Sequence, residues 1–229
     1  MNPRSGEDDA GGARRTQAER SEATRTALIA AARPLFAERG YAAVGTEEIV
    51  DAAGVTRGAL YHHFGDKPGL FAAVMEAVAG DLAYRLIAQQ LASPVGLADG
   101  AWDELRDGIQ AFLDACTGSS DFQRIVLVDG PAVLGHGAWS DLVEQHGLAL
   151  LRTWLQQAID DRQIDPLPVE PLAHLLAALI GEASLYIGQA ADPARARRET
   201  GATIDRILTG LRSQPARPAR RPGAIPSAK

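Results

Sequence analysis

Apolar residues recur with helical spacing along most of this chain, and no segment keeps the alternation of polar and apolar positions typical of a β-strand. The first amphipathic stripe lies between residues 21 and 39 and consists of Leu28, Ala31, Ala32, Leu35 and Phe36. Similar segments, bounded by Gly, Pro or Asp, predict further helices at about residues 46–53, 56–64, 67–91, 98–117, 119–134, 138–162, 169–190 and 193–212. The pattern therefore predicts an all-α protein of about nine helices.

The most distinctive part of the pattern is residues 46–67, which predict two short helices joined by a tight turn. Thr46 is a suitable N-cap for the first helix, and Gly54 supplies the left-handed residue that ends it. In the second helix, Leu60 and Phe64 are four residues apart and point inward. Together with the amphipathic helix before it, this hairpin predicts the trihelical head of a helix-turn-helix protein.

The outer face of the second helix carries residues that differ from the Glu, Lys and Ala of an ordinary exposed helix. These residues are Thr56, Arg57, Tyr61, His62 and His63, and Gly58 and Ala59 lie among them. Arg57 is the only Arg or Lys on this helix, and a guanidinium can donate twice to guanine O6 and N7. We therefore expect Arg57 to read a base edge, with a phosphate contact as the alternative. His62 and His63 point about 100° apart, so they are not expected to share a metal ion.

Five short stretches around this hairpin form a specific combined pattern. They are LFAERGY at 35–41, Thr46 with Ile49, AGV at 53–55, LYHHF at 60–64, and Lys67. Over about residues 21–75 the chain resembles the TetR (tetracycline-repressor-like) family of bacterial transcriptional regulators. The resemblance implies that base edges are faced by Arg57, Gly58 and Ala59, and that the DNA backbone is contacted by Thr46, Tyr61, His63 and Lys67.

Two positions depart from the commonest pattern of that family. Pro34 lies inside the first helix, where it removes a hydrogen bond and should kink the chain. Glu47 lies where many relatives carry a residue that helps to bind DNA, and it is not expected to contact DNA itself. The predicted DNA-binding residues are therefore Thr46, Thr56, Arg57, Gly58, Ala59, Tyr61, His62, His63 and Lys67.

The distribution of charge separates the predicted head from the rest of the chain. The formal net charge of −6 argues against binding to DNA phosphate. Residues 14–68, however, carry eight Arg/Lys and seven Asp/Glu, a net +1, whereas residues 69–212 carry ten and nineteen, a net −9. An acidic body disfavours docking on DNA through any surface other than the head.

Composition divides the chain into four predicted segments. Residues 1–20 and 213–229 lack periodic apolar positions and are expected to be disordered arms. The first arm either enters a DNA minor groove or stays solvated, and both alternatives are open. Residues 21–68 are expected to form the helix-turn-helix head, and residues 69–212 a larger body for ligand binding and dimerisation.

Cysteine content and hydropathy point to the cytoplasm. Cys116 is the only cysteine, so no internal disulfide can form, and a buried helix position is favoured over a redox role. Residues 1–20 do not resemble a signal peptide. The longest charge-free apolar run, residues 171–181, is shorter than the ~20 residues that span a bilayer.

The last two predicted helices differ from the others because the first of them is apolar on nearly all sides. Such a helix must be buried on two sides, so we expect one side to pack on its own body and the other on a second chain. The expected result is a homodimer with a four-helix interface, an arrangement that the family resemblance also implies. The expected interface residues are Leu175, Leu179, Glu182, Tyr186, Ile204, Leu208 and Leu211.

Aromatic residues in the middle of the chain are suited to line a ligand cavity of the usual, mostly apolar kind. The ligand-binding candidates are Trp102, Phe112, Phe122 and Trp139, and Trp154 and His146 lie in the same region. Packing in an ordinary core is the alternative for each of them.

These observations favour a one-component transcriptional repressor. In this hypothesis a homodimer binds a palindromic operator in double-stranded DNA and is released by a small, largely apolar effector, with no cofactor or metal. An all-helical enzyme is disfavoured because the sequence has no nucleophile–base set, phosphate loop, C-x-x-C or H-E-x-x-H motif. A ligand-independent architectural DNA binder would not need so large a body. Activation instead of repression stays open.

Overall fold

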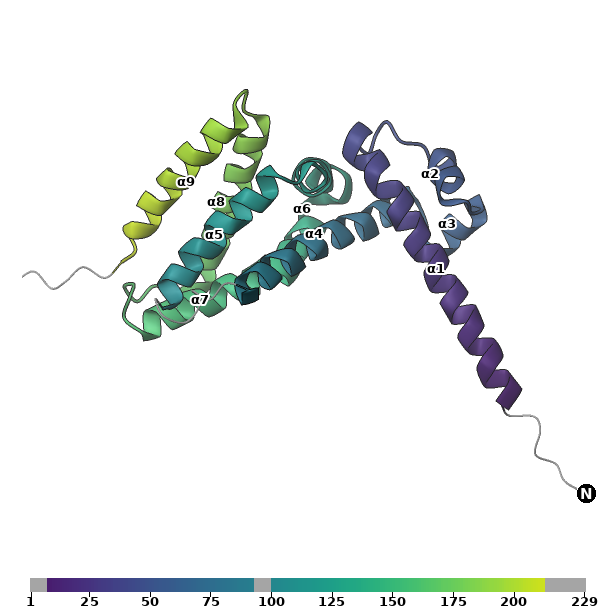
Figure 1. Ribbon diagram of the computed structural model, residues 1–229, viewed down its shortest axis with the longest axis horizontal. Coiled ribbons are helices and arrows are strands. Elements are labelled where there is room, and N and C mark those ends of the chain that lie inside the picture. Colours follow the sequence, from purple (N-terminus) through teal and green to yellow (C-terminus); the bar gives the residue numbers. More distant parts are fainter. Residues whose placement is uncertain (1–7, 93–99, 213–229) are drawn as a thin grey trace, which may run out of the picture.

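The protein is described by a computed structural model over residues 8–92 and 100–212, and this part of the chain is built from helices. In chain order these are α1 (Asp8–Arg39), α2 (Thr46–Ala53), α3 (Arg57–Phe64), α4 (Lys67–Ala92), α5 (Ala101–Thr117), the π-helix η1 (Phe122–Asp129), α6 (Gly130–Val143), the π-helix η2 (Glu144–Leu148), α7 (Ala149–Asp160), α8 (Val169–Gln189) and α9 (Pro193–Thr209). Figure 1 shows α1–α3 at one end, α5 and α7–α9 at the other, and α4 running between them. The prediction of an all-α fold with about nine α-helices is confirmed for the described residues.

Helix α1 is longer than the sequence pattern predicted. It begins at Asp8, within the arm expected to be disordered, and its N-terminal part projects beyond α2 and α3 (Figure 1). Residues 13–20 are mostly Ala, Arg, Gln and Glu, which favour helix without any tertiary contact, so the first helix continues through them. The helix also runs through Pro34 and ends only at Arg39. The predicted arm at residues 1–7 and tail at 213–229 lie outside the described residues.

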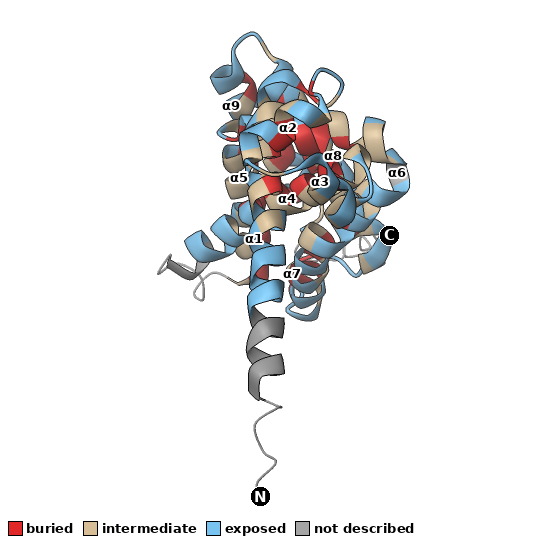
Figure 2. Cartoon of the chain, turned by 90° about the vertical axis from the view of Figure 1, so that its right-hand side faces the viewer, coloured by how far each residue is buried: buried red, intermediate tan, exposed pale blue. Residues whose placement is uncertain are grey.

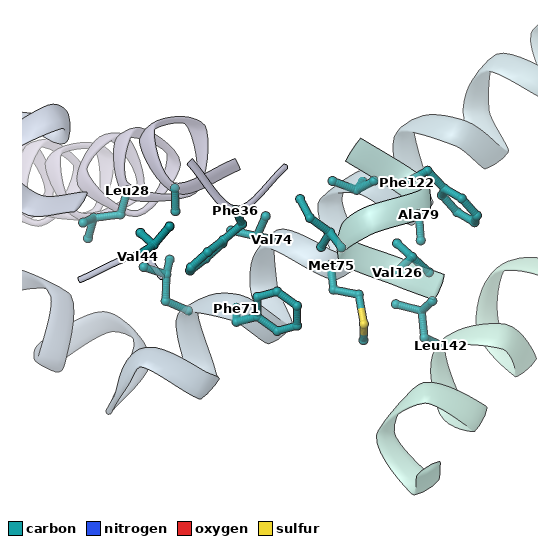
Figure 3. Packing of buried hydrophobic residues seen from close by; sticks show 14 of the residues in the cluster. Leu28, Phe36, Val44, Phe71, Val74, Met75, Ala79, Phe122, Val126 and Leu142 are labelled. Carbon is teal, nitrogen blue, oxygen red and sulfur yellow. The ribbon is translucent and has the colours of Figure 1, made fainter. Parts of the chain in front are cut away.

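One hydrophobic core joins the head to part of the body, and we call it the N-terminal core. It contains Leu28, Ala32, Phe36, Val44, Ile49, Val50, Leu60, Leu70, Phe71, Val74, Met75, Val78, Ala79, Leu82, Cys116, Phe122, Ile125, Val126, Leu127 and Leu142. Figure 3 shows this core continuing from Leu28 and Phe36 along α4 to Phe122 and Val126 of η1. The Phe71 ring meets Phe36 edge-on at 5.2 Å between centroids and Tyr41 at 5.1 Å, which ties α4 to the end of α1.

A second hydrophobic core, the C-terminal core, lies among α5, α7, α8 and α9. It contains Ala101, Trp102, Leu105, Ile109, Leu113, Leu148, Leu151, Trp154, Leu155, Ala158, Ile164, Ala173, Leu176, Ile180, Ala183, Ile187, Ala196, Ile204 and Leu208. Phe112 of α5 packs against both cores. The two cores therefore meet inside the body, and the boundary between them does not coincide with the one expected at residue 68.

Burial follows the same arrangement. Figure 2 shows buried residues gathered where the helices meet, while the projecting part of α1 is exposed wherever it is described. Helix α6 is broken at Gly135, whose φ of 81° is outside the helical region, in agreement with the break expected between residues 134 and 138. The π-helices η1 and η2 stand on either side of α6, and π-helical turns are rare and concentrate at functional sites.

Candidate DNA-binding surface and effector cavity

The turn between α2 and α3 has the geometry that its residues predicted, with one correction. Gly54 is left-handed (φ 65°) and ends α2, and the Thr56 hydroxyl accepts a hydrogen bond from the Ala59 amide at 3.3 Å. The N-cap of α2, however, is Gly45 and not Thr46, which is already the first helical residue. The helix starts one residue earlier than expected because the extended backbone of Gly45 can serve as the cap without a side-chain bond.

The predicted DNA-binding residues are all exposed or partly exposed on the head. Within α3, Leu60 is fully buried on the inner side of the helix, whereas Arg57, Gly58, Tyr61 and His62 are exposed. The others of that set on α2, α3 and α4 are exposed or half-buried, namely Thr46, Thr56, Ala59, His63 and Lys67. The helix-turn-helix hairpin thus has exposed polar side chains and a buried apolar side.

Arg57, at the start of α3, is held by two neighbours. Its Nη1 donates to Glu47 Oε1 at 2.7 Å, and its Nη2 donates to the Tyr61 hydroxyl at 3.2 Å. The hydrogen bond with Tyr61 and the charge of Glu47 raise the pKa of Arg57 above its usual value. The guanidinium is therefore charged and oriented on the surface. The contact with Glu47 is one that sequence reasoning did not foresee.

Lys67 lies at the N-terminal end of α4 and contacts Tyr41, in the turn that follows α1. Its ammonium donates to the Tyr41 carbonyl at 2.6 Å and lies 4.0 Å from the Tyr41 ring centroid. Partial burial lowers the pKa of Lys67. An ammonium has three donors, so this group can hold the Tyr41 loop and still offer N–H groups to a phosphate.

An open groove of about 480 Å³ separates the middle of α1 from the end of α3. It is lined by Gln17, Ala18, Arg20, Ser21, Thr24, His62 and His63. These side chains are mostly hydrogen-bond donors, and none of them is acidic. The groove extends the polar face of α3 towards the projecting part of α1.

Two polar contacts connect the head to η1. Arg33 of α1 donates from Nε to Asp121 at 2.8 Å and also pairs with Asp81 of α4. The Tyr41 amide donates to Asp129 Oδ2 at 2.8 Å. Burial alone would raise the pKa of Asp121, but hydrogen bonds from Ser119 and Arg33, with the Arg33 charge, outweigh it and lower the pKa. Both ends of η1 are thus attached to the head.

A cavity of about 710 Å³ lies between the two cores. The N-terminal core contributes Ala79, Leu82, Phe122, Val126, Leu127 and Leu142, and the C-terminal core contributes Ile109, Leu151, Trp154 and Ile180. Three predicted candidates, Phe112, Phe122 and Trp139, line the cavity, as do Trp154 and His146. Its size is that of sites for drug-sized molecules.

The fourth predicted candidate, Trp102, lies elsewhere. This residue is buried in the C-terminal core and does not line the cavity, and its ring lies 5.8 Å from the Arg212 guanidinium. Aromatic character alone could not separate a core position from a cavity position one or two helical turns away. Sequence reasoning also missed the wall supplied by α4, which includes Ala83, Leu86 and Ile87. Their spacing continues the apolar stripe of that helix and was the available signal.

The polar groups of the cavity are few. His146 of η2 places Nε2 2.7 Å from Glu76 Oε1 of α4. Asp103, Glu104 and Asp107 lie at the α5 end, and none of the described residues that line the cavity is Arg or Lys. Gly108 lies against Trp154, where a Cβ would come within 2.6 Å of the indole ring, so this glycine permits the close approach.

Cys116 is buried in α5, and burial raises the pKa of its thiol to about 12. The thiolate is the reactive species of cysteine, so this thiol is inert at neutral pH. The structure agrees with the expectation of a buried helix residue.

The C-terminal helices carry an exposed apolar face. Leu175 and Tyr186 of α8 are 68% and 59% exposed, and Glu182 lies exposed between them. Leu179 and Leu211 are half-buried. Ile204 and Leu208, expected at a dimer interface, are instead buried in the C-terminal core. Helical periodicity correctly identified one apolar face of α9 but could not tell which neighbour that face contacts.

By length and composition alone, α8 is apolar enough to cross a membrane, although its charge-free run at residues 171–181 is shorter than a bilayer span. One such helix is weak evidence, because core helices of soluble proteins pass the same test. Helix α8 contacts α5, α7 and α9 and contributes six residues to the C-terminal core or its buried surroundings. Its apolar character is explained by this packing and by the exposed face described above.

A helix-turn-helix hairpin with an exposed arginine, on an all-helical body that encloses a cavity, defines a DNA-binding transcription regulator. The profile described as "Bacterial regulatory proteins, tetR family" matches residues 28–74, and "Tetracyclin repressor-like, C-terminal domain" matches residues 102–211. The protein belongs to the TetR family of transcriptional regulators. This family consists of DNA-binding regulators and not of enzymes.

Individual relatives agree with this assignment. The HTH-type transcriptional regulator CymR of Pseudomonas putida is 36% identical over 62% of this chain and 68% of its own. The HTH-type transcriptional activator FasR of Mycolicibacterium smegmatis is 34% identical over 51% of each chain. The crystal structure of a TetR-family regulator from Pectobacterium atrosepticum superposes with a TM-score of 0.70 at 32% identity, covering 86% of this chain and 98% of that one.

Proposed function

We propose that this protein is a cytoplasmic, effector-controlled repressor that binds a palindromic operator as a homodimer. The observation that carries the proposal is the position of the cavity, between the core that contains the head and the core that carries the exposed α8 face. A ligand at this seam contacts both halves at once. It can therefore change how the heads are held relative to the dimer interface.

The surface of the head supports binding in the major groove. Arg57 stands at the N-terminal end of α3, where recognition helices contact base edges. Tyr61, His62 and His63 follow along α3, and the two histidines line the groove that contains Arg20. We assign base contacts to Arg57, Gly58 and Ala59, and backbone contacts to Thr46, Thr56, Tyr61, His62, His63 and Lys67.

The exposed face of α8 supports dimerisation. Three large apolar side chains are exposed to solvent: Leu175 and Tyr186 on α8, and Ile207 on α9. A second copy of this chain would cover them. A two-fold axis there would make the interface self-complementary. Two heads held about 34–36 Å apart would then read half-sites one DNA turn apart.

The cavity supports a small, largely apolar effector. Phe112, Phe122, Trp139 and Trp154 offer ring surfaces, and the part of the lining that the structure describes has no Arg or Lys to neutralise an anionic group. An uncharged molecule fits this lining better than a carboxylate or a phosphate. His146 and the carboxylates at the α5 end would bind the polar groups of the ligand and so orient it.

Signal transfer follows from the two attachments of η1. Phe122, Val126 and Leu127 line the cavity, whereas Asp121 and Asp129, next to and within the same π-helix, hold Arg33 and Tyr41 of the head. A ligand that displaces η1 would therefore move α1 and α4. To shift the population from 1:99 to 99:1, it must favour the released state by about 5.5 kcal/mol.

Activation is the second candidate function, because the relative FasR is an activator. Both candidates share the operator, the dimer and the cavity, and they differ in what bound protein does to transcription. A reporter gene behind the protected DNA distinguishes them: deletion of this regulator raises expression from a repressed promoter and lowers it from an activated one.

The decisive experiment is footprinting on DNA that flanks the protein's own gene, repeated with a library of apolar metabolites. We expect protection of a palindrome at low salt and loss of protection with at least one compound. Absence of any protected palindrome would remove the regulator mechanism. Protection that no compound relieves would remove the effector part and leave DNA binding intact.

A further inference from the structure

The arginine that is proposed to read DNA already has two side-chain partners in the free protein. Glu47 of α2 accepts from Arg57 Nη1 at 2.7 Å, and Tyr61, one turn along α3, accepts from Nη2 at 3.2 Å. The Arg57 guanidinium also lies 5.4 Å from the Tyr61 ring centroid. These bonds use part of the donor fork, and further N–H groups of the guanidinium are left for a base.

Glu47 is out of place on a surface that meets DNA. A carboxylate near the phosphate backbone opposes binding, and the Glu47 side chain is 65% exposed, so it does not support the core of the head. Its neighbour Glu48 also pairs with an arginine, but that arginine is Arg39 of α1 and not a residue of α3. Two adjacent glutamates of α2 thus hold two different arginines.

We propose that Glu47 is a positioning residue for sequence readout: it orients Arg57 towards a base edge and lowers affinity for non-operator DNA. The inference rests on the proposed function, in which Arg57 contacts the operator. A flexible arginine is free to bind any phosphate, which adds affinity without sequence information. An arginine ordered before binding loses less side-chain entropy at the correct base and is withheld from alternative contacts.

The charge of Glu47 acts in the same direction. Repulsion from phosphate weakens every complex with DNA, whereas the orientation of Arg57 helps only the complex with the correct base. The combination raises the ratio of operator affinity to random-DNA affinity, which is the quantity that determines occupancy in a genome.

Glu47→Ala and Glu48→Ala form a matched pair that tests the proposal. Each removes one carboxylate from the first turn of α2 and breaks one Glu–Arg pair, but only Glu47→Ala frees Arg57. Full-length variants are titrated by fluorescence anisotropy with operator DNA, with the same DNA altered at the base pair read by Arg57, and with random DNA at several salt concentrations. That base pair is the one at which Arg57→Ala loses discrimination.

We expect both variants to bind random DNA more tightly, because each loses a repelling charge. Only Glu47→Ala should lose discrimination at the Arg57 base pair, by about 3- to 10-fold. Glu47→Gln, which keeps a neutral acceptor, should lie between wild type and Glu47→Ala. In the free protein, NMR relaxation of the Arg57 Nε–H group should show more motion in Glu47→Ala and no change in Glu48→Ala.

Three outcomes overturn the proposal. Equal discrimination by the two alanine variants would show that Glu47 does not position Arg57. Tighter operator binding by Glu47→Ala with discrimination intact would show that Glu47 only repels DNA and does not position Arg57. If wild-type protein does not distinguish operator from random DNA, the proposed function fails and this inference fails with it. Melting curves of the Glu47, Glu48 and Arg57 variants verify that each is folded.

Discussion

The two hydrophobic cores of this protein support different surfaces of the molecule. The N-terminal core begins under the recognition helix and continues along α4 to η1, so the DNA-binding head and one wall of the cavity are a single packed unit. The C-terminal core supports the opposite wall and the exposed face of α8. The comparison teaches that packing continues from the head into the body across the link between α3 and α4, and that the two cores meet at the cavity.

The largest expected effect comes from breaking the N-terminal core. Phe71→Ala should cost about 3–5 kcal/mol, because it removes a fully buried ring that joins α1 to α4. Leu155→Ala in the C-terminal core should cost about 2–5 kcal/mol. Hydrogen exchange read by mass spectrometry should show Phe71→Ala loosening α1–α4 together with η1, and Leu155→Ala loosening α7–α9. Equal loosening everywhere by both would mean that the two cores form one cooperative unit.

The next effect concerns the face that the C-terminal core supports. Tyr186→Asp should dissociate the proposed homodimer and lower operator affinity by about 100-fold, because the second head is lost from the complex. Tyr84→Asp is the control, since Tyr84 is even more exposed at 75% but belongs to α4 and not to α8 or α9. Light scattering and operator titration check both variants. A dimer that survives Tyr186→Asp would contradict this interface.

At the opposite end of the molecule, Arg57→Ala should cost about 1–3 kcal/mol of operator binding and relax specificity at one base pair. Lys67→Ala should weaken binding to all sequences alike, and it should also lower the melting temperature, because Lys67 holds the Tyr41 carbonyl. Competition titrations with operator and random DNA separate the two. Equal losses on both DNAs from Arg57→Ala would exclude base readout by this residue.

The contact between the head and η1 should appear in acid titrations. The pKa of Asp121 is lowered in the folded protein, so its contribution to stability is present above the unfolded pKa and is lost as pH falls below about 4. Urea unfolding from pH 7 to 3 should show this loss, about 1 kcal/mol, in wild type and not in Asp121→Asn. Asp81→Asn, which removes the more exposed partner of Arg33, should still lose stability as pH falls, as wild type does. Parallel profiles for wild type and Asp121→Asn would contradict the assignment.

The smallest effect is expected at the lone thiol. Cys116 lies in the N-terminal core with its pKa raised to about 12, so a thiol reagent at pH 7–8 should not modify the folded protein. Urea should restore one reactive thiol per chain. Rapid modification of the native protein would mean that α5 opens locally at the seam between the cores.

Much of the head was predictable from sequence because its signals are local. Gly54 and Thr56 act through backbone conformation and a bond three residues away, and Leu60 is buried by simple periodicity. The outward position of Arg57 follows from the same helix. Its bond to Glu47 joins residues ten apart across a turn and needed the structure.

The body was predictable as helices but not as a site. Trp102 and Trp154 have the same chemistry, and only their positions relative to the seam decide that Trp154 lines the cavity. Ile204 and Leu208 likewise form a clear stripe, but the stripe does not say whether the neighbour is the same chain or a partner. Non-local packing decides both questions, and periodicity carries no information about it.

The contact between Gly108 and Trp154 has a consequence for how such a regulator diversifies. Any side chain at position 108 must push the Trp154 ring aside, which reshapes the cavity from its α5 wall. Neither residue belongs to α1–α4 or to the polar face of the head. If the cavity binds the effector as proposed, a single codon change at position 108 would alter which molecule fits, and the DNA-binding face would stay as it is.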